Sequence, residues 1–251
     1  MTDFRDIFGS RLLLSCRVNL RGRPIAGLIG WLKGLSMLGG QLSSDANPGS
    51  PPDILTGAID GHDAWRSDVA QFWEGPDGFI GLNIQTGDRF SVWAVMRRVG
   101  AAPGSDAIPW TVSGSSFLPL SFVKFKSNGK CTYNLHYDDG GSGAQAESAE
   151  VTLDSNFHLH ELHMDEAIGH GAFDGVEITI PTGGAGAGAQ YALPPPYAGL
   201  IWGDASDIFA LGIGTPHDFT EIHVVLGSVT VGEKAAARSI LRGLYPSIGI
   251  A

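Results

Sequence analysis

Short apolar runs separated by turn residues dominate this chain and restrict its fold more than any other feature. Residues 121–126 and residues 131–137 alternate apolar and polar side chains, and Asn128-Gly129 lies between them. Asn-Gly between two alternating runs is the strongest short-range indication of a β-hairpin, because a tight turn needs residues that tolerate positive φ. The sequence therefore predicts antiparallel hairpins as its basic unit.

Further runs of the same kind follow along the chain. Residues 90–96 are β-branched and aromatic with little polar alternation, which is typical of a strand covered on both faces. The 36 glycines and 14 prolines are spread between the runs and form no repeat, so they act as turn residues. At least seven strands at this spacing indicate a sandwich or barrel. The other runs are residues 147–153, 157–164, 175–180, 209–213 and 221–226.

One helix is predicted near the C-terminus. Thr230 and Glu233 have the spacing of a capping box, in which each side chain accepts a hydrogen bond from the other residue's backbone N–H. Pro246 ends the helical pattern. We expect this short helix to cover one end of the sandwich. The apolar positions at helical spacing are Ala235, Ala236, Ile240, Leu241 and Leu244.

The N-terminal region differs from the rest of the chain in charge. Residues 1–40 contain six Arg or Lys residues against two Asp residues, whereas the net charge of the whole chain is −10. We therefore divide the chain into an N-terminal arm or assembly segment, residues 1–40, and one jelly-roll domain, residues 41–251. The arm would bind an acidic partner or a neighbouring copy; alternatively, its cations only solubilise an apolar stretch. Residues 11–20 fit a strand or a short helix.

Composition argues against several classes of protein. A net charge of −10 is unsuited to nucleic-acid binding, which needs a basic face to neutralise phosphates. The apolar segment at residues 27–38 is too short to span a membrane and contains Lys33, so we expect no membrane insertion. Residues 1–10 are polar and of mixed charge, so no signal peptide is expected. Cys16 and Cys131 form no C-x-x-C motif; we expect free, buried thiols, with a disulfide as the alternative.

The order of the segments is itself informative. Successive elements are found at residues 59–66, 90–96, 122–137, 158–165, 210–214, 220–225 and 233–245. In this order and spacing they resemble the concanavalin A-like lectin and glucanase superfamily in its laminin-G-like form, over about residues 40–250. The resemblance implies an all-β, two-sheet antiparallel jelly-roll sandwich with a short C-terminal helix. Residues 245–250 depart from the ending that is usual in that family.

The resemblance also implies a function. Single domains with this layout are similar to structural proteins of tailed bacteriophages. We therefore expect a non-enzymatic structural or adhesion module located in the virion, as a capsid decoration, fibre or tail component. Its partners would be further copies in a homo-oligomer, other virion proteins bound through residues 1–40, and a cell-surface glycan. The alternative is a free, extracellular carbohydrate-active protein, either a lectin or a glucanase-like glycoside hydrolase.

The carboxylates do not favour the hydrolase alternative. Glucanases of this superfamily use an E-x-D-x-x-E pattern on one strand, whereas Glu161, Asp165 and Glu166 have a different spacing. Glu161 and Asp165 would lie about 13 Å apart along a strand, but a retaining hydrolase needs its two carboxyl groups about 5 Å apart. We therefore assign no catalytic residue.

Aromatic residues in or beside predicted loops are the candidates for glycan binding. A sugar stacks its apolar face on an exposed ring while nearby polar groups bind its hydroxyls. The alternative is that these rings fill the core of the sandwich. The candidates are Trp65, Trp110, Tyr191, Tyr197 and Trp202.

A histidine-rich run gives the first candidate metal site. If residues 157–164 form a strand, His158 and His160 point to one face, while Glu161 and His163 point to the other. Two imidazoles supply only half of a zinc site, so a third ligand would be needed from elsewhere in the fold, and His136 is one candidate. The alternative is that these histidines pair across strands or lie at the surface.

Acidic loop residues give the second candidate metal site. Asp204 and Asp207 carry the hard oxygen ligands that Ca²⁺ prefers, although no full ligand set can be identified at fixed spacing. The alternative is that they are solvated acids in a turn. We expect no cofactor, with calcium as the alternative.

Overall fold

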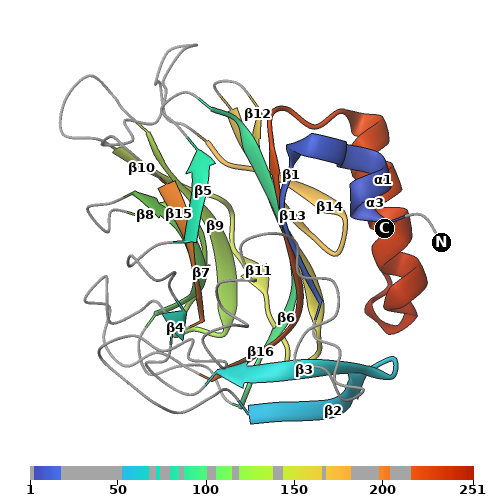
Figure 1. Cartoon of the computed structure of the whole chain (residues 1–251). Coiled ribbons are helices and arrows are strands. Elements are labelled where there is room, and N and C mark those ends of the chain that lie inside the picture. The colour runs from blue at the N-terminus through green and yellow to red at the C-terminus, as the bar shows by residue number, and fades with distance from the viewer. Residues whose placement is uncertain are drawn as a thin grey trace.

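The computed structural model shows a mostly β molecule in which two antiparallel sheets pack face to face (Figure 1). It describes residues 3–17, 53–67, 72–73, 80–84, 88–100, 106–114, 119–137, 144–165, 168–181, 198–203 and 216–251. No helix in these ranges is long and apolar enough to cross a membrane. The prediction of an all-β antiparallel sandwich with a short C-terminal helix is confirmed.

Sheet A contains eight of the described strands. Its strands are β1 (Leu12–Arg17), β2 (Asp53–Ile59), β3 (His62–Ser67), β6 (Phe90–Arg98), β12 (His158–Asp165), β13 (Ile168–Phe173), β14 (Val176–Thr179) and β16 (His217–Leu226). They follow the order β14-β13-β12-β6-β16-β3-β2, with β1 beside β16. The two central strands, β6 and β16, are therefore far apart in the sequence and adjacent in space.

Sheet B covers one face of sheet A. Its strands are β4 (Phe72–Trp73), β5 (Ile80–Ile84), β7 (Ala107–Gly114), β8 (Pro119–Phe125), β9 (Lys130–Tyr137), β10 (Ala144–Glu147), β11 (Val151–Thr152) and β15 (Ala198–Gly203). They follow the order β10-β9-β8-β7-β15-β4, with β11 beside β9 and β5 beside β15.

Two tight turns follow directly from local sequence. Asn128-Gly129 joins β8 to β9 as predicted, with Gly129 at φ 82° and Phe125 paired with Cys131. Asp60-Gly61 joins β2 to β3, with both residues at positive φ. The second hairpin was missed because residues 59–66 were interpreted only as the start of a family motif, although Asp-Gly is a favoured hairpin turn.

β6 is buried on both faces, as its nearly unbroken apolar sequence predicts. Eight of its nine residues are buried, and the exception is Arg97. One face packs toward sheet B, where Gly169 and Gly171 of β13 allow close approach. A Cβ atom on Gly171 would lie 2.5 Å from Cγ of Tyr133, so only glycine fits beneath this ring.

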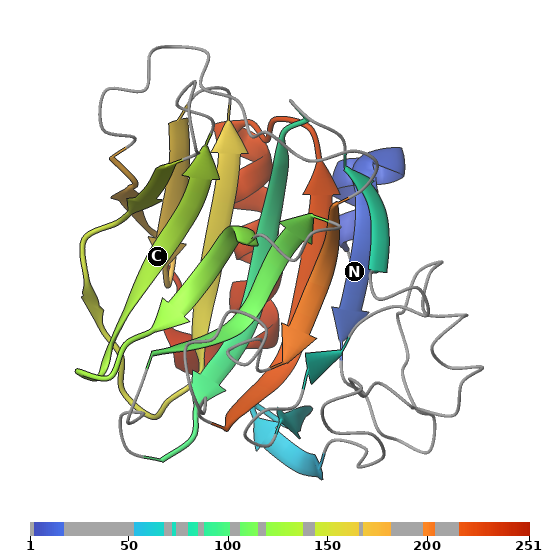
Figure 2. The same cartoon turned by 90° about the vertical axis from the view of Figure 1, so that its left-hand side faces the viewer.

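Helix α3 (Val231–Leu244) covers the other face of sheet A and makes a third layer. The predicted capping box is present, since Glu233 N–H donates to Thr230 Oγ1 and Thr230 N–H donates to the Glu233 carboxylate. The expectation that the helix covers an end of the sandwich was wrong. Figure 2 shows α3 behind the sheets, along the face that carries Trp93 and Leu159.

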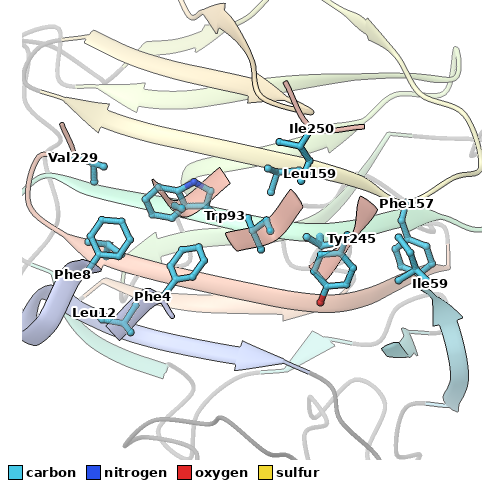
Figure 3. Close-up of a cluster of buried hydrophobic side chains, with 14 of the residues drawn as sticks. Phe4, Phe8, Leu12, Ile59, Trp93, Phe157, Leu159, Val229, Tyr245 and Ile250 are labelled. Atoms are coloured by element: carbon cyan, nitrogen blue, oxygen red, sulfur yellow. The ribbon is translucent and has the colours of Figure 1, made fainter. Parts of the chain in front are cut away.

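The start of the chain belongs to this core and is not a free arm. Helix α1 (Phe4–Phe8) and one 3-10 turn (Gly9–Arg11) lead into β1, which pairs with β16. Phe4 and Phe8 are 2% and 3% exposed and pack on Trp93, with ring centroids 5.6 and 5.4 Å away (Figure 3). Apolar residues that alternate with arginines here serve burial, so residues 3–17 form part of the jelly-roll domain. Residues 18–40 lie outside the described residues.

Several other sequence predictions can now be compared with the fold. Residues 147–153 do not form one strand, because β10 ends at Glu147 and β11 begins only at Val151. The predicted strand at residues 209–213 lies outside the described residues, whereas β16 extends the predicted run 221–226 back to His217. Cys131 is free and buried, and burial raises the pKa of its thiol to about 12.

Truncating Phe8 tests the position of the N-terminal segment. Phe8→Ala should lower the free energy of unfolding by about 3–5 kcal/mol, because it removes a buried ring from the core. Val231→Ala is the control, since Val231 is 84% exposed and its loss should change stability by less than about 0.5 kcal/mol. Urea unfolding followed by tryptophan fluorescence measures both, and equal effects would contradict the described packing.

Candidate functional site

Two His–Glu pairs occupy related positions on the outer face of sheet A. Glu161 and His163 lie two residues apart on β12, and Glu221 and His223 lie two residues apart on β16. The backbone register places Trp93 of β6 between Glu161 and His223. All four polar side chains are buried beneath the helical layer. We call Glu161, His163, Glu221 and His223 the buried polar network.

A histidine on one side and an arginine on the other bond to the carboxylate of Glu161. His163 Nε2 lies 2.9 Å from Glu161 Oε2, and Arg238 Nε of α3 donates to Oε1 at 2.8 Å. Burial raises the pKa of Glu161, but the bonds from His163 and Arg238 outweigh burial and hold that pKa below its usual value. Because an ionised carboxylate only accepts, His163 carries its proton on Nε2. Arg238 also donates to Glu177 of β14 at 2.7 Å.

The pair Glu221 and His223 contacts residues of the N-terminal and the C-terminal segments. The hydroxyl of Tyr245 donates to Glu221 Oε2 at 2.6 Å, and His223 Nε2 lies 2.5 Å from Oε1. Phe4 stacks on the imidazole of His223, with ring centroids 3.6 Å apart and planes within 5°. The network thus joins the N-terminal segment, sheet A and the C-terminal segment.

This network is sealed from solvent. Glu161 is 0% exposed, so it cannot reach a glycosidic bond at the surface. Buried ion pairs of this kind contribute modest net stability but are costly to break, because one uncompensated charge then remains in the core. Its physical effect is to fix where α3 lies on sheet A.

Removing Arg238 tests this role. Arg238→Met should reduce the free energy of unfolding by about 3–5 kcal/mol, because it leaves the buried Glu161 charge with His163 alone. The double variant Glu161→Gln/Arg238→Met removes both charges and should recover a large part of the loss. Arg242→Met, on the same helix, removes one bond to the Ile250 carbonyl and should cost only about 1 kcal/mol. Equal losses for Arg238→Met and Arg242→Met would contradict the assigned role.

The histidines on the inner face of β12 have quite different surroundings. The predicted alternation is confirmed, since His160 faces Phe125 and Tyr133 of sheet B while Glu161 faces α3. His158 lies between two carboxylates, with Nδ1 2.8 Å from Asp174 and Nε2 2.9 Å from Asp154. Burial lowers the pKa of His158, but the two carboxylates outweigh burial and raise it overall.

His160 is a neutral imidazole in an apolar setting. The hydroxyl of Tyr133 donates to the carbonyl of Ala172 at 2.8 Å, so His160 Nδ1, 3.2 Å from that hydroxyl, is the donor in their contact. Nε2 is then a bare, buried nitrogen with no hydrogen-bond partner. Burial lowers the pKa of His160 well below its usual value.

The structure does not bring His158 and His160 together as a zinc site. Both ring nitrogens of His158 are bound by carboxylates, and within the described residues no group of three or more His, Cys, Asp and Glu side chains could hold a metal. The alternative, in which these histidines pair within the fold, fits their contacts. Asp204, Asp207 and the side chain of His136 lie outside the described residues, so the calcium site stays a prediction.

The buried histidines predict a loss of stability in mild acid. Above about pH 6.5 an unfolded His160 is neutral, and below it the unfolded chain binds a proton that the folded chain does not. The free energy of unfolding should therefore fall as the pH drops below about 6.5, and it should fall less in His160→Asn. His158 has the opposite effect on the pH dependence of stability. Its contribution to the free energy of unfolding is complete below the pKa of the unfolded state and is lost as the pH rises through its higher pKa in the folded state.

Thermal unfolding at pH 5 and pH 7.5 measures these effects. His158→Asn is the matched control, because it removes stabilisation that is largest at pH 5 and should increase the loss on acidification. A His160→Asn protein that loses as much stability as the unmodified protein would contradict the assignment.

The aromatic candidates are only partly described. Trp110 of β7 is 0% exposed and fills the core, so it offers no ring face to a sugar and its predicted role was wrong. In the backbone register, Trp202 of β15 lies between Trp110 and Trp73 of β4. The side chains of Trp65, Trp73 and Trp202 lie outside the described residues, as do Tyr191 and Tyr197 entirely.

Sequence reasoning missed a charged cluster where β6 ends and β16 begins. Asp218 is fully buried, and its two carboxylate oxygens accept bonds from Arg66 at 2.9 and 3.1 Å and from Arg97 at 2.6 Å. The Arg97 guanidinium also lies 4.6 Å from the centre of the Phe157 ring. The side chains of Arg66 and Arg97 remain 30% and 28% exposed. No local pattern could reveal this cluster, because its members are far apart in the sequence.

Comparison with known proteins identifies the fold. No family model and no curated protein matches the sequence. The binding domain of botulinum neurotoxin serotype G superposes with a TM-score of 0.56 at 10% identity, over 92% of this chain and 51% of that one. The binding domain of Paraclostridial Mosquitocidal Protein 1 gives 0.53 at 8%, over 96% and 53%.

A third similar structure is that of botulinum neurotoxin type C, a toxin described as dependent on interaction with two ganglioside molecules to enter cells. It gives a TM-score of 0.51 at 7% identity, over 93% of this chain and 51% of that one. The chain thus spans about half the length of each of these structures. At such low identity the likeness shows the fold alone, a β-sandwich that is also found in receptor-binding domains of toxins.

Proposed function

We propose that this protein is a non-enzymatic module that binds cell-surface glycans. The observation that carries the proposal is the match of over 90% of the chain to binding domains of clostridial toxins, one of them described as interacting with gangliosides. A shared fold does not by itself transfer a function, so the contacts of this chain's own residues must support it as well.

The contacts of three titratable groups in sheet A support binding over catalysis. Glu161 and Glu221 are buried and already bonded to cations or donors, and both nitrogens of His158 are bonded to carboxylates. A general acid or base must reach its substrate within hydrogen-bond distance. These groups stabilise the packing of the helical layer and of neighbouring strands on sheet A.

We further propose that the module is carried on a virus particle and belongs to the concanavalin A-like, laminin-G-like group. The support is the order of segments in the sequence, together with the two-sheet antiparallel sandwich that the described residues form. Antibody labelling of purified particles in electron micrographs would detect the protein on the virion. Recovery of the protein only as a free species in the medium would favour the extracellular lectin instead.

A glycan array that includes gangliosides tests the binding function. The full chain should bind a subset of glycans and leave them chemically unchanged, which mass spectrometry of the incubated glycans checks. Tyr197→Ala should weaken binding by about tenfold, the effect of losing one stacked ring of about 1.4 kcal/mol. Trp110→Phe is the control, because Trp110 is buried. Binding to no glycan would overturn the proposal, and cleavage of a bound glycan by the full chain would establish an enzyme.

A further inference from the structure

His163 of β12 lies beneath α3 with only one of its two ring nitrogens bonded. Its Nε2 lies 2.9 Å from Glu161 Oε2, whereas its Nδ1 is buried and has no hydrogen-bond partner. The ring packs edge-on against Trp93, with ring centroids 5.1 Å apart. Because Nε2 carries the proton of the neutral ring, a second proton would have to bind at Nδ1. A buried N–H without an acceptor is costly, so the structure with α3 on sheet A, which we call the closed state, disfavours this proton.

Charged groups on neighbouring elements surround His163. Arg238 of α3 donates to Glu177 of β14 at 2.7 Å, and Lys234 Nζ lies 3.9 Å from the same Glu177 oxygen. With Glu161, these groups comprise two carboxylates and two cations, so a protonated His163 would add a third positive charge. Burial and the repulsion from Lys234 together outweigh the two carboxylates and lower the pKa of His163. The charged and titratable groups around it are Glu161 on β12, His170 on β13, Glu177 on β14, and Lys234 and Arg238 on α3.

Proton uptake by His163 changes which group neutralises Glu161. In the closed state Arg238 Nε donates to Glu161 Oε1 at 2.8 Å and supplies the positive charge, while neutral His163 supplies only a hydrogen bond. A protonated His163 carries the positive charge itself, two residues away on the same strand. Glu161 then no longer needs a cation from α3. If α3 moves off the sheet, water can also reach Nδ1 and accept its hydrogen bond.

We propose that His163 is a pH-dependent latch that releases α3 from sheet A in mild acid while the two sheets stay folded. In the resulting open state Glu161 pairs with protonated His163, and the outer face of sheet A, which carries Trp93 and Leu159, becomes accessible.

The pH range of the latch follows from the two protonation states. A hydrated His163 in the open state takes up its proton below about pH 6.5, whereas the buried ring in the closed state resists it. The closed state is therefore favoured above about pH 6.5 and loses this advantage as the pH falls. One such proton can shift the equilibrium toward the open state by up to about 30-fold at pH 5.

Hydrogen–deuterium exchange of the full chain at pH 7.5 and pH 5 tests the latch. After correction for the intrinsic exchange rate of each amide, α3 should lose about tenfold more protection at pH 5 than β6 does. An equal loss in α3 and β6 would show that acid acts through global unfolding, to which the buried His160 contributes, and it would overturn the proposal. Unchanged protection of α3 at pH 5 would overturn it as well.

A variant that cannot take up the proton identifies the group responsible. His163→Gln keeps an N–H donor for Glu161 but does not titrate between pH 5 and pH 7.5, so α3 and β6 should lose equal protection in this variant. His170→Gln is the matched control, because His170 pairs with His163 in the backbone register and its removal leaves the latch in place. The control should keep the difference between α3 and β6. A His163→Gln protein that keeps this difference would overturn the proposal.

NMR of the unmodified protein gives a test that does not depend on a variant that folds. The ring nitrogen signals of His163 should show a neutral ring protonated on Nε2 at pH 7.5, and their titration should coincide with the loss of protection in α3. A ring protonated on both nitrogens at pH 7.5 would overturn the proposal. So would a His163 that takes up its second proton while α3 stays protected.

Discussion

The architecture depends on one constraint: β6, at the centre of sheet A, is apolar on both faces, and both faces must therefore be covered. Sheet B covers the inner face, where Gly169 and Gly171 leave room for side chains of β9. The outer face carries Trp93, Val95 and Leu159, and α3 together with the N-terminal segment covers it. Because burial of apolar surface is the dominant favourable term in folding, the cover is as necessary as the sheets themselves.

The position of α3 and the N-terminal segment on sheet A is also fixed, because polar groups are buried between them and the sheet. An apolar helix face could slide on an apolar sheet with little change in buried area. Arg238 on Glu161 and Tyr245 on Glu221 prevent this, since a displaced helix would leave carboxylates unpaired in the core. Glu161 and Glu221 therefore have a structural role. At the end of β6, Arg97 is bound in the same way to the buried Asp218.

Local patterns in the sequence predicted individual strands, turns and the C-terminal helix. How these elements pack could not be predicted, because it depends on contacts between residues far apart in the sequence. The Asn128-Gly129 hairpin, the capping box at Thr230 and the doubly buried β6 follow from turn chemistry, capping and hydropathy, each set within a few residues. The position of α3 does not, because it depends on a contact between Arg238 and a β12 residue 77 positions away. Similarly, the prediction of an arm relied on the basic charge of residues 1–40 and did not consider that Phe4 and Phe8 are buried in the core.

Hydrogen–deuterium exchange tests the three-layer account most directly. If α1, β1 and α3 close the outer face of sheet A, their backbone amides should exchange as slowly as those of β6 and β16, through global unfolding alone. Fast exchange throughout residues 4–17 and α3, beside slow exchange in the strands, would show that sheet A is stable without this layer and would contradict the account.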